Sequence, residues 1–424
     1  MSRTVGSQEQ LRASRAIRRL SEPDRVIFRT SKKKLAILST GDLDTLRIEG
    51  LAAERDRESF HADMNMPISN QSGNPVGILA VRAGREWEHL ARARSETVTQ
   101  IEKLKADLRN LDNLDSSIVV FGSLARGEAT HCSDIDWTLL IDGKADTQHL
   151  AMAQKIKSTI SEGKQPGVEG TFGNMAFSHQ ILHCIGGEDD SNANTTRRIL
   201  LLLESMPIGN VDAWENVQKN ILRRYIDEDQ GLRSKTNTRG VPLFLLNDIA
   251  RYWRIMVVDF AYKQRERANR GYALRSIKLG LSRKLIYISG ILACFSCELS
   301  YPERQLFQVD HPQRAIEHLR ATFRRTPLEI IASILINYEE LLEPSRRLFD
   351  AYNRFLGILA DETPTDRATN RRKHIEMLTL DEMEDDEVFQ EARNIRHDFG
   401  EALKDIFLKT NSPIQQLMIE RGVF

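Results

Sequence analysis

One stretch, from residue 116 to residue 141, constrains the fold of this 424-residue chain more than any other. Two apolar segments, Ser117–Phe121 and Asp134–Ile141, are predicted to be β-strands. Gly122 and Ser123 follow the first strand, and an Asp-x-Asp pair opens the second after ten intervening residues. Glycine lets the backbone approach a ligand closely, and the N–H groups at a helix start hold phosphate oxygens. The first half of the stretch therefore predicts a phosphate-binding turn, to which Ser123 adds a hydroxyl donor.

The second half carries two acids, Asp134 and Asp136. Residues two apart on a strand project from the same face. Two carboxylates side by side repel each other unless a cation lies between them. Hard oxygen ligands of this kind suit Mg²⁺ or Mn²⁺, usually shared with the phosphates of a substrate. A phosphate-binding turn facing a carboxylate pair is typical of metal-dependent nucleotidyl transfer.

The complete stretch, VFGSLARGEATHCSDIDWTLL, resembles the signature of the DNA polymerase β-like nucleotidyltransferase superfamily. That signature is a hydrophobic strand, Gly-Ser, a short spacer and Asp-hydrophobic-Asp. The resemblance implies a transferase that moves a nucleoside monophosphate from an NTP, such as ATP, or from a dNTP to a hydroxyl and releases pyrophosphate. It assigns Gly122, Ser123 and Arg126 to the nucleotide, and Asp134 and Asp136 to catalysis and to Mg²⁺ or Mn²⁺.

A third carboxylate usually acts on the attacking hydroxyl in this superfamily, from a later strand. The candidate strand here, Met175–Ile185, contains no acid. Glu169, just upstream, is the first choice for the third catalytic acid. Glu188, Asp189 and Asp190 come next, although their segment resembles a loop leading into a helix cap. Alternatively, a substrate or partner group supplies the base.

The sequence leaves open which molecule carries the hydroxyl that accepts the nucleoside monophosphate. The GSLARGE…SDID form and the helix TTRRILLLLES, residues 195–205, resemble a bacterial branch that includes protein-modifying uridylyltransferases. A catalytic sheet with only a helical domain also resembles bacterial antiviral defence enzymes that make nucleotide signals or short oligonucleotides, which we favour slightly. Nucleotidylation of a protein hydroxyl is the alternative. A non-catalytic interaction module on the same fold is the third reading, against which the intact motif argues.

A basic segment supports the choice of a polyanionic substrate. Residues 251–284 hold ten basic and two acidic side chains, although the whole chain balances 60 against 60. Neutrality excludes a uniformly basic nucleic-acid coat but not a local patch. The resemblance implies that the nucleotide lies between the catalytic sheet and the following helical domain, so the triphosphate needs cations from the helical side. We assign Lys278, Arg283 and Lys284 to it. A run of seven acids in residues 381–391 is a candidate to dock on this basic segment.

The predicted fold class is α+β, a small mixed sheet followed by a large all-helical domain. We expect an N-terminal segment of unclear fold at 1–80, a nucleotidyltransferase catalytic domain with a leading helix at 81–210, and a helical domain at 211–424. The leading helix is predicted over residues 80–111. The later helices are predicted at 147–161, 195–205, 247–263, 274–298, 314–323, 328–348 and 385–408.

The composition limits the cellular compartments in which the protein is expected. Four cysteines are too few for a disulfide framework, and Cys294 and Cys297 are interpreted as core residues one helical turn apart. No run reaches the roughly 18–20 uninterrupted apolar residues of a membrane span, and the start lacks the apolar core of a secretory signal. We therefore expect a cytoplasmic protein with no membrane partner. A homo-oligomer is left open, with the helix around Trp87 as a candidate contact.

Overall fold

The computed structural model describes residues 27–29, 35–37, 74–131, 133–160, 164–166, 171–229, 240–300, 311–360 and 370–423. The chain divides into two compact units, residues 1–73 and 74–424. In the first unit, β1 (Ile27–Arg29) pairs antiparallel with β2 (Leu35–Ile37). All further description concerns the second unit, which carries the predicted site.

The second unit contains a four-stranded mixed sheet. Its strands are β3 (Ser116–Phe121), β4 (Trp137–Ile141), β5 (Asn174–Phe177) and β6 (Ser205–Pro207), in the spatial order β5-β4-β3-β6. β3 runs antiparallel to both β4 and β6, whereas β4 and β5 are parallel. The sheet and the helices that follow it confirm the predicted α+β class.

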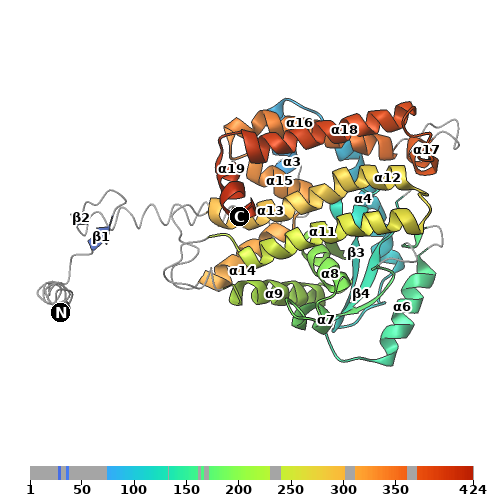
Figure 1. The fold of residues 1–424 in the computed structure, drawn as a ribbon. Coiled ribbons are helices and arrows are strands. Elements are labelled where there is room, and N and C mark those ends of the chain that lie inside the picture. Colours follow the sequence, from blue (N-terminus) through green and yellow to red (C-terminus); the bar gives the residue numbers. More distant parts are fainter. Residues whose placement is uncertain are drawn as a thin grey trace, which may run out of the picture. The chain divides into compact units, whose positions relative to one another are not determined.

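Helices make up most of the rest (Figure 1). In chain order the main ones are α3 (Pro75–Ala83), α4 (Glu88–Asp107), α5 (Gly122–Arg126), α6 (Thr147–Thr159), α7 (Ser178–His183), α8 (Asn192–Leu203), α9 (Val211–Asp227), α11 (Leu243–Glu266), α12 (Tyr272–Lys278), the π turn η2 (Leu279–Arg283), α13 (Lys284–Leu299), α14 (His311–Phe323), α15 (Pro327–Leu335), α16 (Leu342–Ala360), α17 (Arg371–Met377), α18 (Glu387–Lys404) and α19 (Pro413–Leu417).

The sheet is buried on both faces because alternate residues of β3 enter two different cores. Ile118 and Val120 pack with the apolar sides of α4 and α6. Val119 and Phe121 face the other way, into the large core that α8, α9, α11 and α13 share. Figure 1 shows α11, α12 and α13 crossing between the sheet and the C-terminal pair α16 and α18. One face of the sheet thus shares its core with the helical part.

Several predicted elements differ from the structure. The single helix over residues 80–111 is wrong, because Gly84 ends α3 with a left-handed φ of 60° and α4 starts afresh. The third strand is shorter than Met175–Ile185, since α7 begins at Ser178. The helix over residues 328–348 is two helices, α15 and α16. β6 was not predicted, because three residues carry no strand periodicity.

The C-terminal helices also fold back on the leading ones. Trp87 is buried and its ring lies 4.9 Å from that of Phe349, while its Nε1–H donates to Asp350 Oδ1 at 2.8 Å. Trp87 therefore packs inside the unit, and a homo-oligomer through its helix stays a prediction. Two acids of 381–391 pair locally: Asp386 Oδ2 lies 2.5 Å from His374 Nε2, and Glu391 pairs with Arg371. That the run docks on the basic segment stays a prediction.

One helical stretch among the described residues, Tyr272–Leu299, has the length and composition of a membrane span, and 72% of its most apolar window is buried inside the fold. This is how the central helix of a folded core behaves. Cys294 and Cys297 lie on it as free, fully buried thiols. The interpretation of the pair as core residues is confirmed.

Candidate active site

The Asp136 carboxylate lies directly against the backbone of Gly122. Gly122 follows β3 with a left-handed φ of 68°. A Cβ there would stand 2.7 Å from Asp136 Oδ2, so only glycine supplies both the conformation and the space. The Phe121 N–H donates to the Asp136 carbonyl at 2.8 Å and keeps the two segments together. No side chain caps α5, which leaves its first N–H groups to solvent or a ligand.

The two acids precede β4 rather than lying on it, because the strand begins at Trp137. Asp134 is exposed and Asp136 is half-buried. Burial, and then the neighbouring Asp134 carboxylate, raise the pKa of Asp136 above its ordinary value. Two adjacent carboxylates with this mutual effect form a site that a cation stabilises.

The helical part directs two cations at this pair. Three positive charges act to lower the pKa of Asp136 and so partly offset this rise. They belong to Arg126 from α5 and to Arg283 and Lys278 from the helical part. Lys278 immediately precedes the π turn Leu279–Arg283, and Arg283 is its last residue. Residues five apart are hydrogen-bonded in a π turn and so lie on one side of the helix. A continuous α-helix would turn the two cations apart, whereas here both act electrostatically on Asp136. Burial, and then neighbouring arginines, lower the pKa of Lys278 to about 8.

Residues 101–168 match the family model of a nucleotidyltransferase domain. The matched segment contains the Gly-Ser turn and both acids, and it supports the polymerase β-like superfamily. A comparison with curated proteins finds no match. The family supports a general nucleotidyl transfer activity and an NTP as substrate.

Within the nucleotidyltransferase domain, Arg126 is held by buried acids rather than left open. Its Nε donates to Glu128 Oε2 at 2.7 Å, and its Nη1 pairs with Glu204. The Tyr352 hydroxyl, from α16, donates to Glu128 Oε1 at 2.9 Å. Arg126 thereby ties the turn after β3 to the end of α8 and to the helical part. Its charge acts on Asp136 from beneath the site.

Lys284 lies on a different surface from the other two assigned cations. It follows the π turn immediately and lines a cleft beside α18. Burial, and then the charges of Arg396 and Lys404, lower the pKa of Lys284. Both neighbouring cations lie on α18, outside the nucleotidyltransferase motif. The structure therefore brings Lys278 and Arg283 to the acids and does not bring Lys284 there.

The third acid stays a prediction. Glu169 lies outside the described residues. The acid that sequence reasoning missed is Glu204, which is buried. Burial raises the pKa of Glu204, and the Asp136 carboxylate adds to this rise. Glu204 stands just before β6, where Ser205 pairs with Phe121 across the sheet. Its position as the one acid in TTRRILLLLES is the only sequence signal that marks it.

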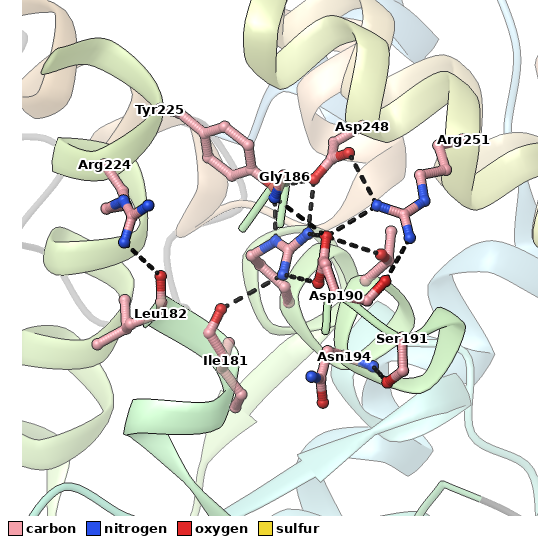
Figure 2. Close-up of polar contacts among 12 residues, drawn as sticks. Ile181, Leu182, Gly186, Asp190, Ser191, Asn194, Arg224, Tyr225, Asp248 and Arg251 are labelled. Atoms are coloured by element: carbon pink, nitrogen blue, oxygen red, sulfur yellow. Dashed lines mark hydrogen bonds and ion pairs between the residues drawn. The ribbon is translucent and has the colours of Figure 1, made fainter. Parts of the chain in front are cut away.

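Asp190 serves the framework of the fold. Arg198, fully buried, donates to both Asp190 oxygens at 3.0 and 2.9 Å, and to Asp248 Oδ2 at 2.6 Å. Figure 2 shows Asp190, Tyr225, Asp248 and Arg251 converging: Asp248 and Arg251 come from α11, Tyr225 comes from α9, and Asp190 precedes α8. Burial alone would raise the pKa of Asp190, but the hydrogen bonds and the positive charge of Arg198 lower it below its ordinary value. This cluster fastens α8 to α9 and α11, and Asp190 has all its partners there.

The chemistry of Asp134 and Asp136 fits a divalent cation. Both are oxygen donors, they repel each other, and they lie beside the turn that is predicted to bind phosphate. No group of three His, Cys, Asp or Glu side chains in the described ranges is arranged to hold a metal ion. Two carboxylates completed by phosphate and water are the usual Mg²⁺ arrangement, so the remaining ligands would come from the nucleotide and solvent.

Proposed function

We propose that this protein is a metal-dependent nucleotidyltransferase that makes a nucleotide signal or a short oligonucleotide in bacterial defence. One observation carries the proposal: the Asp136 carboxylate touches Gly122, and two cations of the helical part act on the same carboxylate from above. A nucleotide between them would meet backbone N–H groups, a carboxylate pair and positive charge together. Those are the three requirements of nucleotidyl transfer.

The protein groups have distinct tasks in this proposal. The N–H groups of the turn and the Ser123 hydroxyl hold phosphate oxygens. Lys278 and Arg283 neutralise the charge that develops on the leaving pyrophosphate. Asp134 and Asp136 would hold Mg²⁺ or Mn²⁺, which supplies Lewis acidity to the phosphate and the attacking hydroxyl. Glu169 remains our candidate for the base.

Nucleotidylation of a protein is the second candidate function. The likeness of GSLARGE…SDID and of residues 195–205 to protein-modifying uridylyltransferases favours it. The basic character of residues 251–284 favours a nucleotide or oligonucleotide acceptor instead. Both functions share the same donor site and differ only in the acceptor hydroxyl. A cytoplasmic location is part of the proposal in either case.

The test is incubation with each of the NTPs and dNTPs and Mg²⁺, with the products resolved by mass. A free nucleotide product supports the first function, and a mass increase on a protein supports the second. Asp136→Asn should abolish turnover, because it removes a metal ligand. Asp107→Asn, at an exposed aspartate outside the motif, is the matched control and should retain it. No turnover with any donor would favour a non-catalytic module on the same fold.

A further inference from the structure

A cleft lies beside α12 and the π turn, and neither Asp134 nor Asp136 contributes to its lining. Its volume is about 620 Å³, within the range of small-molecule sites. Ser276, Gly280 and Lys284 line it at helical spacing, together with α11 and α18. Lys278 and Arg283, on the same helix, belong to the active site. The two sites therefore stand back to back across one helix.

One wall of this cleft is aromatic. Trp253, Phe260 and Tyr272 contribute to it, and each is half-buried. The Trp253 ring is stacked on Tyr287 at 5.3 Å with an interplanar angle of 16°. The Phe260 and Tyr272 rings lie 5.4 Å apart. Rings that are fixed from behind and open in front form a surface on which a planar base stacks.

The opposite wall is strongly basic. Arg393, Arg396 and Lys404 project from α18, and Lys284 faces them from α13. The single carboxylate in the lining, Glu401, is already bound by Lys404 at 2.5 Å. Four cations against one acid repel one another when no anion is present. This wall therefore has the electrostatic character of a phosphate site.

Two glycines shape the cleft. A Cβ at Gly280 would stand 2.3 Å from Arg396 Cδ, so this glycine lets the arginine stem lie against the π turn. Arg396 Nη1 also donates to Ser276 Oγ at 3.1 Å, which fixes the guanidinium. Gly400 lies inside α18, where glycine is a poor helix former. A Cβ there would meet nothing within 4 Å, so packing does not demand glycine. Its absent side chain keeps the cleft open.

We propose that this cleft is a second ligand site, which binds a phosphorylated nucleoside by stacking its base on Trp253 and holding its phosphate with Arg393 and Arg396. The ligand is either a free nucleotide or the 5′-phosphorylated end of a short oligonucleotide, since both present a base beside a phosphate. The proposal rests on the cleft alone and needs neither the metal nor turnover at the other site.

The test measures binding of a fluorescent ATP derivative to the full chain in EDTA, where metal-dependent binding is absent. Gly400→Leu projects a side chain into the cleft, and we expect at least tenfold weaker binding. Gly400→Ala, the matched variant, should bind within about threefold of the wild type and confirm that the helix tolerates substitution. Arg396→Gln should weaken binding of the derivative about tenfold, because it removes a phosphate partner.

Competition identifies the ligand class. AMP or a 5′-phosphorylated tetranucleotide should displace the derivative, and whichever does so at lower concentration is the better ligand. Adenosine should compete at least tenfold more weakly than AMP, because it lacks the phosphate. Pyrophosphate competing as well as AMP would overturn base recognition. Equal binding of the derivative by the wild type and Gly400→Leu would show that the ligand does not bind in this cleft. If Asp136→Asn kept its turnover, only the proposed function would be contradicted.

Discussion

Substitution of Gly122 by alanine isolates the contact on which the active site depends. The substitution has two effects, a strained backbone and a displaced carboxylate, which can be measured separately. The left-handed backbone costs an alanine about 1–2 kcal/mol. The added Cβ would also approach Asp136 Oδ2 to 2.7 Å, where ordinary contact begins at 3.4 Å. The carboxylate must therefore retreat by the difference, 0.7 Å.

Gly127→Ala is the matched control. Gly127 ends the same short helix with a φ of 72°, so alanine there pays the same backbone cost. Its Cβ would meet only Thr326 Cγ2 at 3.9 Å, an ordinary contact. Both variants should lower the free energy of unfolding by about 1–2 kcal/mol, and urea unfolding measures that loss. The difference between them reports the displacement of Asp136.

Activity is where the two variants should separate. A misplacement of about 1 Å can reduce the rate of a reaction on the order of 100-fold. We expect Gly122→Ala to lower Mg²⁺-dependent pyrophosphate release by about 10- to 100-fold, with a higher Mg²⁺ requirement. Gly127→Ala should keep most of its turnover. Equal turnover and equal Mg²⁺ dependence in the two variants would refute the assignment of Asp136 to the metal.

Replacing Arg198 by Met removes the fully buried cation from Asp190 and Asp248 and leaves them Arg251, which is 2.8 Å from Asp190. The free energy of unfolding should therefore fall by about 3 kcal/mol, whereas exposed Arg254→Ala should change it by less than about 0.5 kcal/mol in the same urea titration. Burial, and then Arg325, lower the pKa of His318 from 6.5 to about 4. The unfolded chain then binds a proton that the folded chain does not, so stability should fall as pH drops from 6.5 to 4, by at most about 3 kcal/mol. His318→Gln should flatten that slope in urea midpoints measured against pH. Lys278, with a pKa of about 8, loses its charge as pH rises from 7 to 9, so the KM for the NTP should rise; Lys278→Arg, charged throughout, should keep KM constant over that range.

The contiguous half of the site was predictable from sequence. Gly122 and Asp136 belong to a single stretch between two strands, so local chemistry and spacing were sufficient to associate them. Even there, sequence could not show that the carboxylate touches the glycine backbone. That contact depends on how the segment before β4 returns along β3.

The site residues from segments far apart in the chain were harder to predict. Lys278, Arg283 and Lys284 looked equivalent because a basic segment read at 3.6 residues per turn gives no sign of a π turn. The extra bonded residue separates Lys284 from the other two. Glu204 was hidden for a related reason: its place near Asp136 comes from the pairing of β6 with β3, between residues far apart in the chain.

The π turn also makes a countable mark in the sequence. It amounts to one residue inserted into an otherwise regular helix, and the wider turn absorbs that residue. A related chain one residue shorter between Tyr272 and Leu285 would need no π turn, because its two cations would be four residues apart and share a face of a regular helix. A related chain of equal length without the π turn would separate them by about 140° around the helix. Helix length here, counted in any related sequence, would therefore show whether that protein also needs the π turn to keep its cations together.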